Sequence, residues 1–147
     1  MANAIYGKGR AAFLDGDIDW AADDIKCLLV DSTDYTVSID VDQYCNKDTI
    51  PDAARVTNGL SGNFANKSST LGVADADDVT LSSVSGEQCE ALVIFKDGGG
   101  GGVSQSGTDD LLIAYIDTAT GLPVTPNGGD ITISWDSGRR RFSSFET

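Results

Sequence analysis

Few residues in this chain have the chemistry that catalysis at neutral pH requires. The 147 residues include no histidine, which removes the commonest general acid–base and the commonest metal ligand. A Ser-His-Asp triad, a Cys-His pair and a histidine zinc site are therefore excluded by composition. We expect no catalytic residues, no metal site and no cofactor, so the sequence predicts a protein that is not an enzyme.

The three cysteines, Cys27, Cys45 and Cys89, are too widely spaced for a CxxC motif. Zinc-ribbon and thioredoxin-type sites are accordingly not predicted. An odd number leaves at least one thiol unpaired or available to another chain. Two interpretations stay open: the thiols are reduced and packed as small apolar groups, or they form disulfides between subunits of an assembly.

A run of five glycines, Gly98 to Gly102, invites comparison with a phosphate-binding loop. Such a loop needs a lysine and a Ser or Thr directly after its last glycine, at the start of a helix. Here "VSQSGTDD" follows, with no lysine and with two aspartates that would repel a phosphate. The run instead predicts a flexible hairpin loop between two apolar segments, able to order against a neighbouring subunit.

Two acidic clusters are candidate calcium sites. "DGDID" (15–19) begins like an EF-hand loop, but Trp20 stands where that loop needs glycine and Lys26 where it needs glutamate. "DADD" (75–78) is also rich in carboxylates. Each cluster is interpreted either as a solvated acidic turn or as a weak calcium site.

The one basic cluster consists of Arg139, Arg140 and Arg141. It is interpreted as an edge strand protected by charge, as a contact with the acidic surface of an identical subunit, or as a phosphate contact. The three arginines and the three cysteines are the candidate inter-subunit contacts.

The charge balance restricts the partners. With 23 acidic and 10 basic residues the formal net charge is -13, which argues against nucleic acid or an anionic membrane as a partner. No run of about 18 apolar residues occurs, and the first twenty residues do not resemble a signal peptide.

The elements that must position these residues are mostly strands. Short apolar or alternating runs are separated by turn clusters, and no long helical period occurs. This pattern predicts an all-β fold, a single-domain antiparallel β-sandwich or barrel with a short N-terminal helical turn or arm. Residues 1–24 are expected to form the arm or short helix, and residues 25–147 the sandwich domain.

Individual strands follow from their patterns. Ile25–Asp31 reads as a buried strand, and the alternation of Tyr35, Val37, Ile39 and Val41 indicates a half-buried strand or extended arm. Residues 79–84 and 89–96 are predicted to form a hairpin through "SGE". Further strands are expected at 54–60, 62–66, 111–117, 130–136 and around Phe142 and Phe145.

Three stretches resemble a known group of proteins. "MANAIYGKGRAAFLDGDIDWAADDIKCLLVD", "EALVIFKD" and "LLIAYIDTATGLPVTPNGGDITISWD" are similar to small structural proteins encoded among the virion genes of tailed bacteriophages. The resemblance implies a capsid decoration or cement protein in the virion, assembled in the bacterial host cytoplasm. Its implied partners are the major capsid protein or other virion subunits, bound as a homo-oligomer or as copies on a lattice.

Two alternatives remain. Within the same class, the chain is a tail tube, neck or baseplate component. In another class, it is a carbohydrate- or receptor-binding β-sandwich module. That module would need exposed aromatics on one face, whereas Trp20, Trp135 and the four tyrosines are scattered in sequence.

Overall fold

The computed structural model describes residues 3–135. Within this range the chain forms a five-stranded and a two-stranded antiparallel sheet, one short α-helix and two short 3-10 helices. The elements are β1 (Ala4–Ile5), α1 (Gly7–Asp15), β2 (Ile25–Val30), η1 (Asp52–Ala54), β3 (Arg55–Leu60), η2 (Thr70–Gly72), β4 (Val79–Leu81), β5 (Ala91–Lys96), β6 (Leu111–Ile116) and β7 (Ile131–Ile133). The expected β-rich, antiparallel character is confirmed.

The larger sheet has the order β1-β6-β5-β2-β3, so β5 lies at its centre. The strands β2, β5 and β6 are nearly continuous apolar runs because both faces of this sheet are covered. Alternate residues of β2 enter different cores: Cys27 and Leu29 face one, and Leu28 and Val30 face the other.

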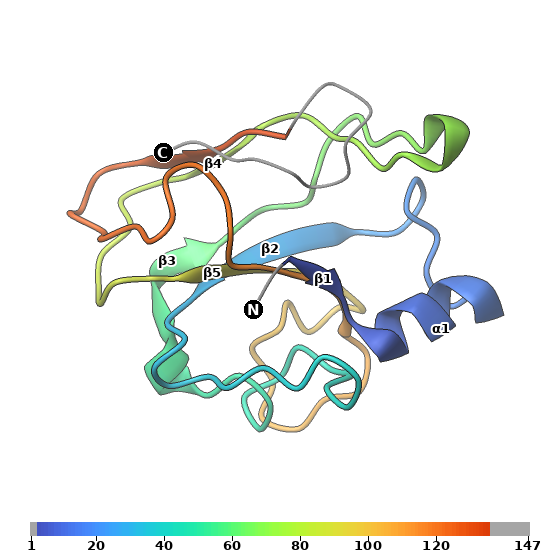
Figure 1. Ribbon diagram of the computed structural model, residues 1–147, viewed down its shortest axis with the longest axis horizontal. Helices are drawn as coiled ribbons and strands as arrows, with labels where there is room; N and C mark the ends of the chain where they lie inside the picture. Colours follow the sequence, from blue (N-terminus) through green and yellow to red (C-terminus); the bar gives the residue numbers. More distant parts are fainter. Residues whose placement is uncertain (1–2, 136–147) are drawn as a thin grey trace.

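Different structures cover the two faces (Figure 1). The two-stranded sheet β4–β7 lies over one face, and Leu81, Ile131 and Ile133 pack into the core below it. The other face is covered by irregular segments from residues 31–54 and 97–110, drawn in blue-to-teal and tan at the bottom of Figure 1. Three layers result, and the middle one carries most of the buried apolar residues.

The N-terminal residues belong to this body. Strand β1 pairs with β6, aligning Ala4 with Tyr115 and Ile5 with Ala114. Helix α1 packs closely on β6 through Gly9, where any Cβ would collide with the backbone of Leu112 and Ile113. The expected short helix within residues 1–24 is confirmed as Gly7–Asp15, and it ends at Gly16 in the left-handed conformation.

The predicted hairpin of residues 79–84 with 89–96 is wrong. Both sides of β5 are occupied, by β2 and β6, so β4 cannot pair with β5. It pairs instead with β7, more than fifty residues away along the chain, with Leu81 opposite Ile131 and Val79 opposite Ile133.

The strand expected at 62–66 does not form, and of the two alternatives for 35–42, a strand or an extended arm, the strand does not form. Residues 62–66 make no ladder, and residues 35–42 are extended or turned without strand pairing. The alternation in 35–42 has another cause: Tyr35 is buried and Val37 and Ile39 pack partly against the sheet, so the segment is an extended cover. The strand expected around Phe142 and Phe145 lies outside the described residues.

A chain of hydroxyl groups fastens this cover to the sheet. The hydroxyl groups of Tyr6 and Tyr35 are 2.8 Å apart, and the Tyr35 hydroxyl donates to Asp42 Oδ2 over 2.8 Å. Burial raises the pKa of both tyrosines well above the ordinary value. Both therefore stay protonated and keep the donors that this chain requires.

Candidate docking site

The glycine run is held by two carboxylates. Asp97 Oδ1 accepts hydrogen bonds from the amides of Gly99 and Gly101, both at 2.8 Å. Asp110 accepts from Gly98 over 2.8 Å and from Gly102 over 2.6 Å, one amide for each oxygen. The strands on either side form the expected β5–β6 hairpin, but its loop is folded around these carboxylates.

The two carboxyl groups differ in their affinity for a proton. Burial raises the pKa of Asp110 against the pull of the glycine amides, and Asp97 raises it further. Burial alone would also raise the pKa of Asp97. The Lys26 ammonium, 2.6 Å from Asp97 Oδ2, and the amides of Gly99 and Gly101 outweigh burial and lower that pKa to about 2. Asp97 is therefore the more acidic member of the pair.

This pair has the composition of an acid–base site, but its contacts are structural. Asp110 is 2 % exposed, and both of its oxygens already accept a backbone amide. Arg55 supports the same loop by donating from Nη1 to the Gly102 carbonyl over 2.5 Å. The ionisable groups here close a loop and leave no carboxyl oxygen directed at a substrate.

The acidic turn at 15–24 is likewise folded on itself. Asp19 Oδ1 accepts from the amides of Ala21 and Ala22, both at 3.1 Å. Lys96 donates to the Asp17 carbonyl over 2.6 Å and pairs with Asp23 at 3.2 Å. Among residues 3–135, no three His, Cys, Asp or Glu side chains are grouped so as to hold a metal ion.

The second acidic cluster also serves the fold. Asp78 accepts from the Ser134 hydroxyl over 3.1 Å and from the Trp135 amide over 3.2 Å, which ties the residues after β7 to the start of β4. Asp77 accepts from the Asn66 side chain over 2.6 Å.

All three thiols are free and fully buried. Burial raises the pKa of Cys27, Cys45 and Cys89 to about 12, so each is protonated at neutral pH. A disulfide between subunits would require one of them to reach the surface. All three cysteines thus lie in the cores and not at the surface.

The other candidate contacts, Arg139, Arg140 and Arg141, lie outside the described residues.

Both tryptophans belong to an internal aromatic cluster. The ring of Phe64 lies 6.2 Å from that of Trp20 and 5.2 Å from that of Trp135, centroid to centroid. Trp20 is 6 % exposed and Phe64 is 4 % exposed. An exposed aromatic platform of the kind that binds sugars is therefore not built from these rings.

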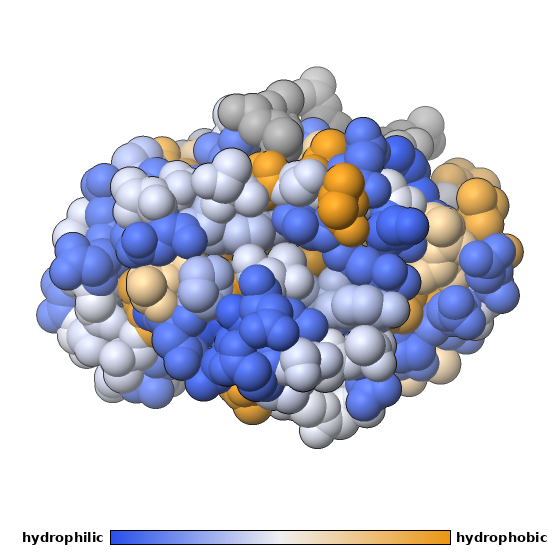
Figure 2. Space-filling model, turned by 90° about the horizontal axis from the view of Figure 1, so that it is seen from below, coloured by the Kyte–Doolittle hydropathy of each residue, from blue (hydrophilic) through white to orange (hydrophobic). Residues whose placement is uncertain are grey.

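An apolar pocket of about 550 Å³ lies between α1 and the η2 segment. Its wall includes Ile5, Phe13, Ile18, Trp20 and Ala74. Figure 1 shows α1 and η2 at the same end of the molecule, one below and one above the large sheet. Apolar side chains also gather at the α1 end in the space-filling view of Figure 2.

Large apolar side chains stand exposed beside this pocket. Leu14 on α1 is 88 % exposed and Leu71 in η2 is 91 % exposed, while Phe13 is 36 % exposed and lines the wall. Leu71 has a φ of 55°, a left-handed conformation that costs an L-residue roughly 1–2 kcal/mol. A strained leucine that is 91 % exposed contributes little burial to the fold, which makes it a candidate contact residue.

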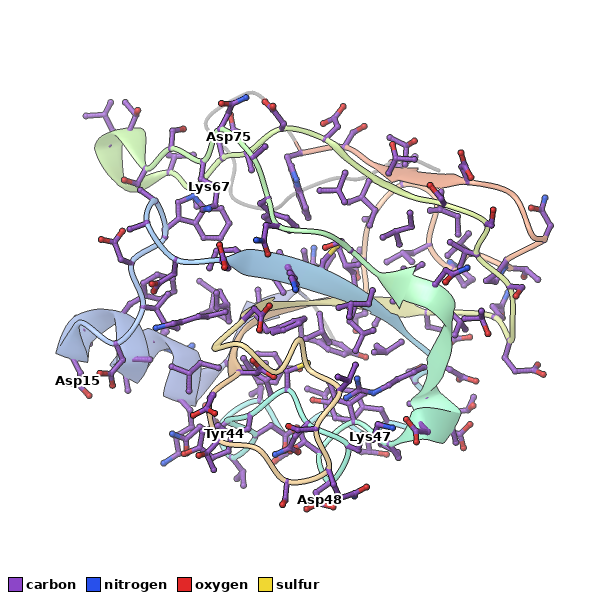
Figure 3. All side chains as sticks on the ribbon, turned by 180° about the vertical axis from the view of Figure 1, so that it is seen from behind. Asp15, Tyr44, Lys47, Asp48, Lys67 and Asp75 are labelled. Atoms are coloured by element: carbon purple, nitrogen blue, oxygen red, sulfur yellow. The ribbon has the colours of Figure 1, made fainter. Side chains whose placement is uncertain are left out.

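The pocket borders a strongly acidic loop. Five aspartates occur between residues 15 and 24, and Asp19 lines the pocket itself. Asp15 and Asp17 are exposed. In Figure 3 Asp15 marks the outer end of α1, and Lys67 and Asp75 lie across the same end of the molecule near η2. The pocket thus combines an apolar interior with a mainly acidic border.

A second hollow of about 450 Å³ lies along the edge strand β1 and β6. Its polar groups are already used: Arg10 donates to the Ile5 carbonyl over 2.8 Å, and the Asn3 side chain bonds Asp117 and Thr118. It offers fewer unoccupied groups to a ligand than the apolar pocket does.

Sequence reasoning did not identify the apolar pocket. Its two walls come from residues 5–20 and 69–74, which only the fold brings together. The available signal was "AAFLDG", where two consecutive large apolar residues in a short helix cannot both face one core.

No family model matches the chain, and no curated protein matches its sequence. None of the helices in residues 3–135 has the length and apolar character needed to cross a membrane.

Proposed function

We propose that this chain is a structural subunit of a tailed-bacteriophage virion, a capsid decoration or cement protein that binds the head shell and stabilises it. The observation that carries the proposal is Leu71, an exposed leucine held in a left-handed conformation beside an apolar pocket. Adhesion to another protein surface is the function that rewards such an arrangement.

The chemistry of the described residues supports adhesion over catalysis. The carboxylates with shifted pKa values close the glycine loop, the thiols are buried and protonated, and the pocket walls are apolar. We therefore propose that the protein has no enzymatic activity. The resemblance of its two ends and second half to phage virion proteins supports the same class.

The proposed partner is the major capsid protein or another shell subunit. A cement subunit is bound in many copies on a repeated lattice, so modest affinity for each contact suffices. The charge of -13 suits the outside of a DNA-filled shell, and nucleic acid and membrane are not proposed as partners. We also propose that the fold is a β-sandwich, because the β4–β7 sheet and the large sheet pack around one apolar core.

Purified virions test the proposal. Mass spectrometry should find the protein in particles at a lattice-related copy number, and cryo-EM should place it on the head. A reconstitution assay should then show that Leu14→Ser and Leu71→Ser weaken binding to shells that lack the protein. Val41→Ser is the matched control, because Val41 is 72 % exposed and, unlike Leu14 and Leu71, is not next in sequence to a residue that lines the pocket. Absence of the protein from purified particles would refute the proposal.

Location on the tail or neck is the remaining alternative within this class. The cryo-EM map distinguishes it directly, and a tube subunit would also form rings in solution.

A further inference from the structure

We propose that the apolar pocket between α1 and η2 binds the chain's own C-terminal segment, residues 138–147, "GRRRFSSFET". The phenylalanines Phe142 and Phe145 would enter the pocket, and the three arginines would face the acidic loop at 15–24. This inference goes beyond the proposed function and does not depend on it.

The chemistry of the segment complements that of the pocket. A pocket of about 550 Å³ with apolar walls accepts aromatic side chains. Asp15 and Asp17 are exposed, and no described side chain bonds their carboxylates. The segment carries three consecutive arginines directly before its first phenylalanine, so it offers both a basic group for the acidic loop and aromatic side chains for the pocket.

The end of the described chain lies close to the pocket. Trp135 packs on Phe64 at 5.2 Å, and Phe64 packs on Trp20 at 6.2 Å. Trp20 is itself part of the pocket wall. Phe142 follows Trp135 by seven residues, which reach roughly 24 Å when extended, several times either ring separation.

An attached segment also has an advantage over a separate one. A short tether gives an effective concentration on the order of millimolar when it spans the distance without strain. A segment with even weak intrinsic affinity therefore occupies the pocket of its own chain before that of another copy.

The test is a competition between the attached segment and a free peptide of the same sequence. Full-length protein and the Phe142→Ala/Phe145→Ala variant are titrated with "GRRRFSSFET", and binding is followed by tryptophan emission and by calorimetry. We expect the variant to bind the peptide and the unaltered protein to bind it at least tenfold more weakly. A Phe142→Leu/Phe145→Leu variant, which keeps apolar side chains, should resemble the unaltered protein.

Two pairs of Asp-to-Asn substitutions, one beside the pocket and one away from it, show where the peptide binds. In the Phe142→Ala/Phe145→Ala background, Asp15→Asn with Asp17→Asn should weaken the peptide severalfold at low salt and less at high salt. Asp34→Asn with Asp109→Asn removes the same charge from exposed positions that do not line the pocket and should have little effect.

Three results would overturn the inference. The peptide binds neither protein, or it binds both equally, or sedimentation shows that the segment joins two copies in a concentration-dependent way. Hydrogen exchange on the unaltered protein gives a second measurement that needs no variant. Amides of α1 and residues 69–74 should exchange faster in the Phe142→Ala/Phe145→Ala variant, and unchanged exchange would count against the contact.

Discussion

Asp97 and Asp110 hold the same glycine run from the two ends of one loop. Asp97, at the end of β5, binds the amides of Gly99 and Gly101, and Asp110, before β6, binds those of Gly98 and Gly102. Anionic acceptors are well suited to amides that no strand partner satisfies. The loop thus owes its shape to side chains outside the run, which gives it consequences for stability.

Asp110→Asn should destabilise the fold by roughly 1–3 kcal/mol. Each Asp110 oxygen accepts one glycine amide, and an asparagine would direct its own NH2 group at one of these donors. Chemical denaturation measures the change. Asp109→Asn is the control, because Asp109 is exposed and its substitution should change stability by less than about 0.5 kcal/mol. Equal effects of the two substitutions would contradict the assigned role of Asp110.

Asp97 should make stability depend on pH at the acidic end. Its pKa in the folded protein is about 2, below the ordinary value near 3.9 for an unfolded chain. Its contribution is therefore complete above about pH 4 and is lost as pH falls toward 2, by about 2 kcal/mol. Asp110 acts in the opposite sense, because its pKa is raised and its contribution declines as pH rises through that value.

Denaturation of the native protein and of Asp97→Asn at pH 5 and pH 2.5 measures this effect. The difference in unfolding free energy between the two proteins should be large at pH 5 and should shrink at pH 2.5. A difference that stays constant would show that the charge of Asp97 does not stabilise the loop.

Three strands of the large sheet, β2, β5 and β6, could be predicted from sequence because their signal is local. Residues 25–30, 91–96 and 111–116 are apolar except for Lys26 and Lys96, which is typical of strands buried on both faces. The partner of β4 could not be predicted, because alternation marks a strand and does not identify the strand beside it. Its neighbour in sequence, β5, was already enclosed by β2 and β6.

The candidate site was less predictable than the sheet. The aspartates beside the glycines argue against a phosphate on charge alone, but their role as acceptors for the glycine amides depends on how the loop closes. The pocket depends on a helix and a 3-10 turn that lie more than fifty residues apart in sequence. A pattern of neighbouring residues does not show which distant segments of the chain lie side by side in the fold.

The cysteines should be inert in the folded protein. All three are buried with pKa values raised to about 12, so a thiol reagent at pH 8 should modify almost none of them until denaturant is added, when all three react. Leu14→Cys supplies an exposed thiol at an 88 % exposed position as a positive control. Rapid labelling of the native protein, or a dimer on a non-reducing gel, would favour disulfides between subunits.

Leu71→Gly should stabilise the fold while weakening adhesion. Glycine removes the roughly 1–2 kcal/mol cost of the left-handed backbone at a φ of 55° and costs about 0.5–1 kcal/mol in chain entropy, so we expect a net gain of up to about 1.5 kcal/mol. Little burial is lost, because Leu71 is 91 % exposed. Val103→Gly is the control: Val103 is 55 % exposed and is not among the residues with a positive φ, so that substitution should destabilise.

Opposite signs for these two substitutions would show that Leu71 is kept at a cost in stability. If Leu71→Gly also reduces binding to shells, then the strained leucine is part of the contact surface, a trade of stability for function that is common at binding sites. If both substitutions lower stability equally, the backbone at Leu71 is not strained. The argument that the exposed leucine exists for adhesion then loses its physical basis.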